Sequence, residues 1–290
     1  EVRARQTQHD SRRRLVQYSP SRRTALVLCG TGAHGAYHAG VVRALQEAGV
    51  RIDLVAGHGV GAAGAMLSAI DGGGRLWEPQ GIWRSAQSQS LYGWTPKIQL
   101  VRWAFLALAL SLPTAAVLTA VAPSTPLVGQ ISVAALVLAF VAAAVIAGTI
   151  GVARSQRQVR RRAAGNPWWD VGGTPFDATG AIRVFSETIW QLIRGASRDP
   201  RPPQDAGRRY ADVLADSLGQ PGFRELMIVA TDLDAHGDVV AALLREPYRR
   251  DFIAPRVGRE RRAEALDLTG AGREHALDIM AAALTPPVGC

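Results

Sequence analysis

Cysteine and lysine are nearly absent from this chain of 290 residues. Cys29 and Cys290 are the two cysteines. Two are too few for a disulfide framework or a cysteine metal site, so a reducing compartment is expected. The histidines lack the spacing of metal ligands, and no metal or other cofactor is predicted. Lysine occurs only at Lys97, so arginine supplies nearly all of the 33 basic residues, and the formal net charge is +9.

Arginine is concentrated in runs at residues 1–14, 21–23 and 153–162 rather than spread along the chain. Such runs are typical of solvated segments, and beside an apolar stretch they also suit anionic lipid headgroups. No nucleic-acid partner is predicted, and the sequence does not indicate an oligomeric state. A starting methionine and a secretory signal pattern are both missing, so we expect a piece of a longer chain.

Charge is missing altogether from two stretches, residues 103–122 and 127–153. At about 1.5 Å of rise per residue, each would cross a hydrocarbon core of roughly 30 Å as a helix. Residues 123–126, PSTP, leave room only for a tight turn, so the sequence predicts a transmembrane hairpin in which Pro113 kinks the first helix without breaking it. Basic residues on both flanks place the soluble parts in the cytoplasm, and a bacterial inner membrane is the expected location. A pair of buried core helices is the alternative.

The hairpin interrupts a domain that continues after it. The predicted organisation is a basic N-terminal arm at 1–22, the first part of the domain at 23–96, the transmembrane hairpin at 97–154, a linker with helices at 155–210 and the second part of the domain at 211–290.

A glycine-rich loop follows the first predicted strand, RRTALVLC at residues 22–29. Gly30, Gly32 and Gly35 fit the pattern G-x-G-x-x-G, and apolar residues at helical spacing follow over residues 41–48. Strand, loop and helix in this order suit phosphate binding. A dinucleotide site would also need an acidic residue at the end of the second strand, residues 51–57, whose acid Asp53 lies near its start. Nucleotide binding is therefore kept as a third hypothesis.

A second glycine loop, AGHGVGA, follows that second strand. It has the glycine spacing of a nucleophile elbow, G-x-S-x-G, but Gly59 stands where the serine is required. Two successive strand–loop–helix units of this kind are how an acyl hydrolase places the N–H groups of an oxyanion hole beside its nucleophile.

The pair GTGAHGAYHAGVVRAL and VAGHGVGAAGAML resembles the patatin-like phospholipases, whose pattern is G-G-G-x-R/K-G-x-x-x-x-G followed by G-x-S-x-G. A later stretch, ELMIVATDLDAHGD, resembles a strand of that family ending in T-D-L. The resemblance covers residues 23–76 and, more loosely, 224–290. It implies a three-layer α/β fold with a mostly parallel sheet and helices on both faces. It also implies lipid ester hydrolysis by a Ser–Asp dyad through an acyl-enzyme.

Carried over by position, the resemblance assigns a set of site residues. The oxyanion loop would be Gly30, Thr31, Gly32, Ala33, His34 and Gly35, and the elbow Gly57, His58, Val60 and Gly61 around the nucleophile position Gly59. Thr31 and His34 depart from the usual glycine and arginine, which leaves the backbone donors in place but removes a permanent positive charge. Gly59 suits a strained turn and cannot attack a carbonyl.

No other group convincingly replaces the missing serine. His58 is adjacent but more typical of a base than of a nucleophile in acyl transfer, and Ser68 lies along the following helix. The dyad aspartate is expected beyond residue 290, since Asp71-Gly72-Gly73 comes too soon after the elbow and is interpreted as the end of a helix. Two main hypotheses follow. The chain is either a lipid acyl hydrolase that has lost its serine, or a non-catalytic protein that binds membrane lipids or a partner.

Overall fold

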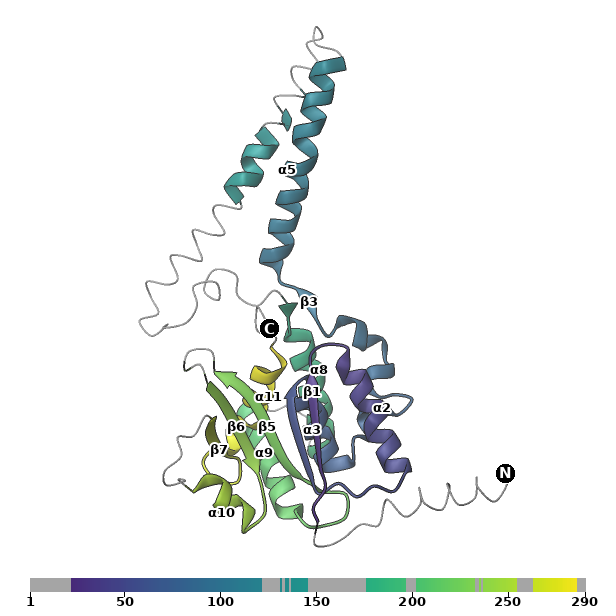
Figure 1. Cartoon of the computed structure of the whole chain (residues 1–290), viewed down its shortest axis with the longest axis vertical. Coiled ribbons are helices and arrows are strands. Elements are labelled where there is room, and N and C mark those ends of the chain that lie inside the picture. Colours follow the sequence, from purple (N-terminus) through teal and green to yellow (C-terminus); the bar gives the residue numbers. More distant parts are fainter. Residues whose placement is uncertain are drawn as a thin grey trace, which may run out of the picture. The chain divides into compact units, whose positions relative to one another are not determined.

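The computed structural model describes residues 22–121, 131, 134–135, 137–145, 176–196, 202–232, 235, 237–254 and 263–285 (Figure 1). They fall into two compact units. Unit 1 comprises the described residues up to Tyr92 and from Ala178 onward, and unit 2 comprises the described residues between Gly93 and Asp177. The predicted N-terminal arm and the arginine-rich run at 153–162 lie outside these residues, apart from position 22.

Unit 1 is built on a five-stranded, mainly parallel sheet with the strand order β1-β2-β5-β6-β7. Its strands are β1 (Ala25–Gly30), β2 (Leu54–Gly59), β5 (Glu225–Asp232), β6 (Gly237–Leu243) and β7 (Ala263–Asp267). All neighbours pair in parallel except β5 and β6, which are antiparallel. In β5 the buried residues Leu226, Ile228 and Ala230 alternate with half-buried ones, which is the period-two pattern of a strand with a covered face.

Helices follow the strands and supply most of the core. They are α2 (His34–Glu47), α3 (Val60–Asp71), α4 (Gly74–Trp77), α8 (Thr179–Ile193), α9 (Pro203–Ser217), α10 (Tyr248–Ile253) and α11 (Ala276–Leu284). Three short 3-10 turns are η2 (Ile82–Arg84), η3 (Ala86–Ser90) and η4 (Arg273–His275). Every residue of α3 from Val60 to Ala69 is buried, because this apolar helix lies against the sheet and is enclosed by other helices.

The main helical layer packs against one face of the sheet. The helix α3 contacts β1, β2 and β5, and α11 contacts β5 and α3. In β1 the side chain of Leu28 is buried, whereas Val27 is 62% exposed. The mixed α/β fold with a mainly parallel sheet is therefore confirmed. Within the described residues, no second helical layer covers Val27 on the other face, so the three-layer arrangement stays a prediction.

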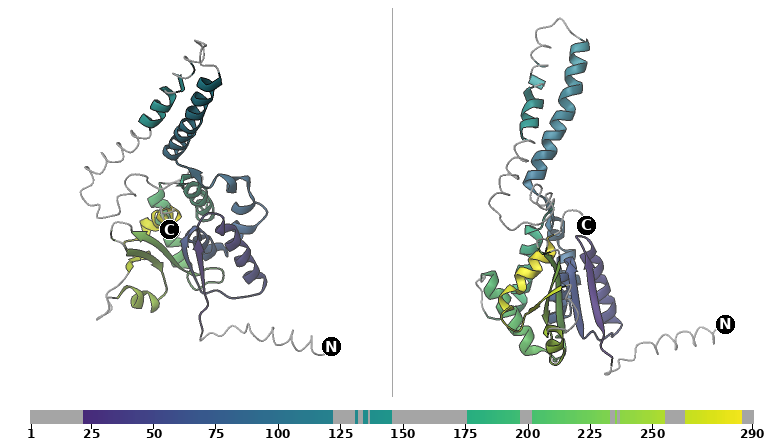
Figure 2. Two further views of the ribbon diagram at one scale, coloured as in Figure 1. Left: turned by 45° about the horizontal axis from the view of Figure 1, so that its top comes forward. Right: turned by 60° about the vertical axis from the view of Figure 1, so that its left-hand side comes forward.

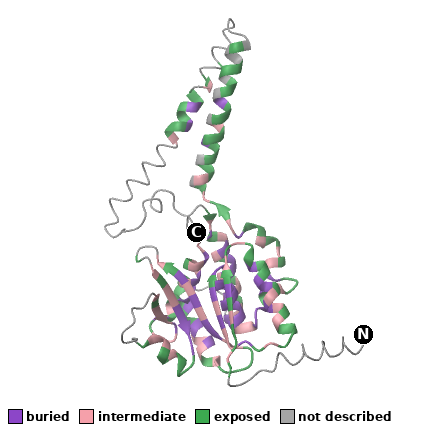
Figure 3. Cartoon of the chain, in the orientation of Figure 1, coloured by how far each residue is buried: buried purple, intermediate pink, exposed green. Residues whose placement is uncertain are grey.

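Unit 2 contains a long helix and a short strand pair. The helix α5 spans Pro96–Val121 and continues through Pro113, as the sequence predicted. The strands β3 (Gly93–Trp94) and β4 (Phe176–Asp177) pair in antiparallel fashion, and the rings of Trp94 and Phe176 are 4.8 Å apart. A second helical stretch at 137–145 runs beside α5 (Figure 2). Most described residues of α5 are exposed (Figure 3).

The predicted transmembrane hairpin is not found. Within the described ranges, no helix has both the length and the apolar character needed to cross a membrane. The apolar sequence of α5 is interrupted near its centre by Ser111, Pro113 and Thr114. The tight turn predicted at 123–126 and much of the second segment, 127–153, lie outside the described residues.

Candidate functional site

The two glycine loops meet at the carboxyl ends of β1 and β2. These strands are parallel neighbours, and their last residues, Gly30 and Gly59, are paired in register. The helix α2 begins at His34 after a short turn, whereas α3 begins at Val60 directly after β2. The structure thus brings together the oxyanion loop and the elbow that the sequence predicted. Their chemical roles remain predictions.

Gly59 has the strained backbone of an elbow residue. It precedes the first residue of α3, with φ 62° and ψ −135°. Residues with a β-carbon rarely adopt a positive φ, and such a conformation costs them on the order of 1–3 kcal/mol. Glycine adopts it freely. The chain therefore keeps the sharp strand-to-helix turn of a nucleophile elbow, with a residue that suits the turn and carries no hydroxyl.

The carbonyl group of Gly30 stands in the place of a side chain at position 59. A β-carbon built on Gly59 would lie 2.1 Å from the oxygen of Gly30. Real β-carbons essentially never come within 3.0 Å of a heavy atom to which they are not bonded. Gly30 itself has φ 139°, a backbone conformation that side-chain-bearing residues rarely adopt. A serine at position 59 would thus need the peptide group between Gly30 and Thr31 to turn away.

Two histidines of α2 hold the loop in this arrangement. The ring of His34 contacts the carbonyl oxygen of Thr31 through Nδ1 at 2.8 Å, and that of His38 contacts the carbonyl oxygen of Cys29 through Nε2 at 3.0 Å. Each ring nitrogen faces a carbonyl, which only accepts, so it carries the proton and donates. The two contacts fix the carbonyl groups on either side of the Gly30 carbonyl.

His38 was not singled out as a site residue in the sequence. Only 6% of its surface is exposed, and burial lowers its pKa, so that the neutral form is favoured. Its Nδ1 atom is buried without a hydrogen-bond partner among the described residues. The spacing of four residues from His34, which puts both rings on the same side of α2, was the signal that could have identified it.

Some backbone N–H groups of the loop form the first turn of α2 and are not available to bind an oxyanion. The N–H groups of His34, Gly35 and Ala36 donate to the carbonyl groups three residues earlier, at 3.2, 3.3 and 3.0 Å. Candidate oxyanion donors must therefore precede His34. Gly35 belongs to α2, and a β-carbon there would lie 1.9 Å from the indole ring of Trp83, so this glycine serves packing rather than the loop.

The flanking elbow glycines allow α3 to approach the sheet. A β-carbon on Gly61 would lie 1.9 Å from the carbonyl oxygen of Leu28, and one on Gly57 would lie 2.3 Å from the carbonyl oxygen of Gly61. The other two elbow residues do not line a shared site. Val60 is buried, and His58 is exposed between two buried strand neighbours, so its side chain points away from the helical layer.

Asp71 cannot serve as the partner of an elbow nucleophile. It is the last residue of α3, and Gly72 follows in the left-handed conformation that ends a helix. Since α3 has 12 residues, about 18 Å of helix separates Asp71 from Gly59. The carboxylate accepts hydrogen bonds from the N–H groups of Gly73 and Arg75 at 2.7 and 3.3 Å. Burial raises its pKa. Its role at this end of the helix is structural.

Asp53 lies at the amino-terminal ends of the strands, whereas the glycine loops lie at their carboxyl ends. It precedes β2, and its Oδ2 accepts a hydrogen bond from the N–H of Thr24 at 2.9 Å. A ribose held at the end of β2 would be out of its reach. The geometry therefore disfavours nucleotide binding by the first glycine loop.

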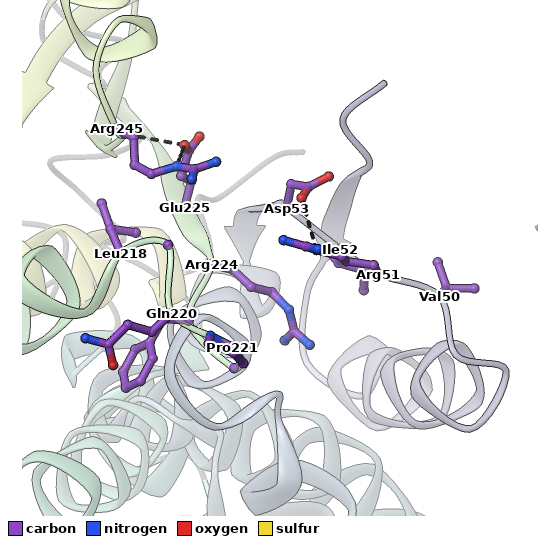
Figure 4. Close-up of a pocket in the computed structure, with 13 residues that line it drawn as sticks. Val50, Arg51, Ile52, Asp53, Leu218, Gln220, Pro221, Arg224, Glu225 and Arg245 are labelled. Atoms are coloured by element: carbon purple, nitrogen blue, oxygen red, sulfur yellow. Dashed lines mark hydrogen bonds and ion pairs between the residues drawn. The ribbon is translucent and has the colours of Figure 1, made fainter. Parts of the chain in front are cut away.

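A cavity of about 350 Å³ opens at the same amino-terminal ends, around the starts of β2 and β5 (Figure 4). It is lined by residues 50–53, 218–225 and 245. Both carboxylates that line it are paired. The buried carboxylate of Glu225 binds Arg23 and accepts a hydrogen bond from Nε of Arg245 at 3.0 Å, while Arg51 lies 3.7 Å from Asp53. A second hollow, of about 450 Å³, is lined by residues of β5, β6 and β7. Neither contains Gly30 or Gly59.

Comparison with known proteins gives the same family as the motifs. Residues 26–119 match the model of the patatin-like phospholipase family, from β1 through most of α5. A stretch of 54 residues is 44% identical to neuropathy target esterase sws of Drosophila persimilis, and one of 63 residues is 40% identical to that of Drosophila sechellia. These stretches cover 19% and 22% of this chain and 4% of each relative. No solved structure gives a significant match. The family match and the two glycine motifs thus agree that residues 26–119 are similar to the patatin-like phospholipases.

Proposed function

We propose that this patatin-like domain binds an acyl lipid at the elbow and does not hydrolyse it by serine attack. The family supports a lipid ligand. The observation that carries the proposal is the geometry of Gly59, which has no hydroxyl and whose missing side chain is replaced in space by the carbonyl oxygen of Gly30. Lipids of this class reside in membranes, so the proposed location is a membrane surface.

A bound water is a poor substitute for the serine. It would need a base within hydrogen-bond reach. His34 and His38 donate to backbone carbonyl groups, and Asp71 lies at the far end of α3. Hydrolysis by a general base is therefore not supported by the described residues.

The catalytic half of the proposal is tested with a fluorophosphonate probe and a short acyl ester. The chain and its Gly59→Ser and Gly59→Ala variants are compared, and circular dichroism shows whether the variants fold. We expect no labelling and no turnover in any of them, since both substitutions put a β-carbon against the Gly30 carbonyl. Turnover by the unmodified chain would refute the proposal. Activity of Gly59→Ser alone would show that the loop can open.

The binding half is tested by titration with a monomeric short-chain phospholipid in a calorimeter. Thr31 is exposed in the loop. In Thr31→Glu a bound lipid would cover the new carboxylate and remove it from water, so binding should weaken by about tenfold or more. The matched control is Ala44→Glu, at an exposed position further along α2. No heat of binding, or an equal effect of both variants, would refute a lipid site at the elbow.

A latent hydrolase is the second candidate, and one observation favours it. The backbone of Gly59 keeps the positive φ of an elbow, although glycine does not require it. Activity would then need both a serine at position 59 and a turned Gly30–Thr31 peptide. The variant Gly59→Ser/His34→Ala, which also removes one of the two histidine contacts to the loop, should gain ester turnover that Gly59→Ala/His34→Ala lacks.

A further inference from the structure

The two helices of unit 2 bury small side chains and expose large ones. Ala104 and Ser111 on α5 are 8% and 5% exposed, and Ala139 and Ala142 on the neighbouring helix are 8% and 5% exposed. The larger apolar residues face outward. On α5 they are Leu100, Trp103, Phe105, Leu106, Leu110 and Val117, exposed by 45–60%, and on the second helix Val137, Leu138, Phe140 and Val141, exposed by 50–76%.

This distribution is the reverse of that in a water-soluble helix pair. There, an apolar stripe of large side chains is buried between the helices and polar residues face water. Helices that contact lipid pack through small residues such as alanine and serine, because the surrounding acyl chains are as apolar as leucine. Ala104 and Ser111 are seven residues apart and thus share one face of α5. The second helix runs beside α5 in both views of Figure 2.

Aromatic and basic groups gather at one end of α5. The guanidinium of Arg102 lies 5.4 Å from the ring of Trp103, and Trp94 stacks with Phe176 just before the helix begins. Trp94 is 48% exposed and Trp103 is 59% exposed. Tryptophan and arginine are enriched where apolar segments meet lipid headgroups. These residues mark the level of α5 at which an acyl environment would give way to a polar one.

We propose that unit 2 is a lipid-contacting element, whose outward apolar side chains insert among acyl chains of an anionic bilayer. Arg102 and the exposed tryptophans lie at the headgroup level. A large exposed apolar surface marks an interaction site, and the small-residue packing beneath it points to lipid rather than to another protein. The inference concerns unit 2 and does not rest on what the elbow binds.

Flotation with vesicles of phosphatidylcholine and phosphatidylglycerol tests this proposal on the full chain. We compare the unmodified chain with Leu106→Glu/Leu110→Glu, which puts two carboxylates on the outward face. The matched control is Tyr37→Glu, which puts a carboxylate in place of a large residue of unit 1 that is 72% exposed. The double variant should lose at least about 100-fold in partitioning, given the cost of carboxylates among acyl chains, and the control should keep it.

Two results would overturn the proposal. Equal partitioning of the double variant and the control would show that the outward face does not contact lipid. Light scattering of the chain without vesicles that gives a dimer, converted to a monomer by the double variant, would assign the surface to a second copy. Binding of the monomeric phospholipid should persist in the double variant, so failure here is distinguishable from failure of the elbow site. Far-UV circular dichroism shows that each variant is folded.

Discussion

Replacing Gly61 by alanine probes how closely α3 must lie against β1. In the structure a β-carbon at this position would be 1.9 Å from the carbonyl oxygen of Leu28, whereas ordinary contacts begin at 3.4 Å. The obstacle is backbone, so it cannot move aside as the end of a flexible side chain would. Either α3 leaves the sheet, or β1 bends.

The cost follows from the burial of α3. Moving this helix disturbs a run of ten buried residues, and overpacking of a core costs about 1–3 kcal/mol and occasionally more. Alanine also has the better helix propensity, by about 1 kcal/mol. Because the contact is with backbone, we expect the upper end of the overpacking range, and after the gain in propensity a net loss of about 2 kcal/mol in the free energy of unfolding.

Urea unfolding followed by far-UV circular dichroism measures this loss. Gly40→Ala is the matched control, since Gly40 is an exposed residue inside α2 and a β-carbon there meets nothing within 4 Å. That variant should gain about 0.5–1 kcal/mol. If Gly61→Ala were as stable as Gly40→Ala, the close approach of α3 to β1 would be refuted.

Three further substitutions test the packing and charges of unit 1. Ser68→Ala should be neutral or stabilising by about 1 kcal/mol, because the Ser68 hydroxyl is fully buried without a hydrogen-bond partner in the described residues. Glu225→Gln should lower the free energy of unfolding by about 1–3 kcal/mol, because the carboxylate joins Arg23 to Arg245, both of them partly exposed. Burial raises the pKa of Asp71, so the folded state binds its proton more tightly than the unfolded state does. The stability that comes from this tighter proton binding is present at low pH and is lost as pH rises through the folded pKa. Compared with the wild type, Asp71→Asn should therefore be more stable at neutral pH than at acidic pH.

The same unfolding assay decides each case. A large loss of stability in Ser68→Ala would mean that its hydroxyl has a partner. An unchanged Glu225→Gln would show that the ion pairs contribute nothing measurable. For Asp71, the difference in unfolding free energy between the wild type and Asp71→Asn is followed against pH, and a difference that does not change with pH would contradict the raised pKa.

Local patterns in the sequence predicted β1, β2, β5 and the elbow helix well. The first strand was expected at 22–29 and is found at Ala25–Gly30. The helix after the elbow was expected to end at Asp71-Gly72-Gly73 and is found at Val60–Asp71. The helix expected at 41–48 begins earlier, at His34. Glycine and histidine are weak helix formers, but the turn bonds from His34, Gly35 and Ala36 start the helix inside the glycine loop.

No pattern in the sequence shows how the peptide group after Gly30 is oriented at the candidate site. The spacing of Gly30 and Gly59 predicted that the loops meet, but not that the Gly30 carbonyl would point at the elbow. Contacts between residues far apart in the sequence also could not be predicted. Trp83 occupies the space beside Gly35, and Arg224 donates a hydrogen bond to the carbonyl of Ser68, although 156 residues separate the latter two.

The inward carbonyl of Gly30 also reverses the polarity that a bound molecule meets at the elbow. In an acyl hydrolase this place presents N–H donors to a developing oxyanion. Here a group that reaches Gly59 meets an acceptor oxygen. Boronates and phosphonates, which mimic the tetrahedral oxyanion, would be repelled there, whereas an alcohol or an amine would be accommodated as a donor. A site of this polarity would then recognise a free hydroxyl or amine of a ligand rather than the carbonyl of an ester.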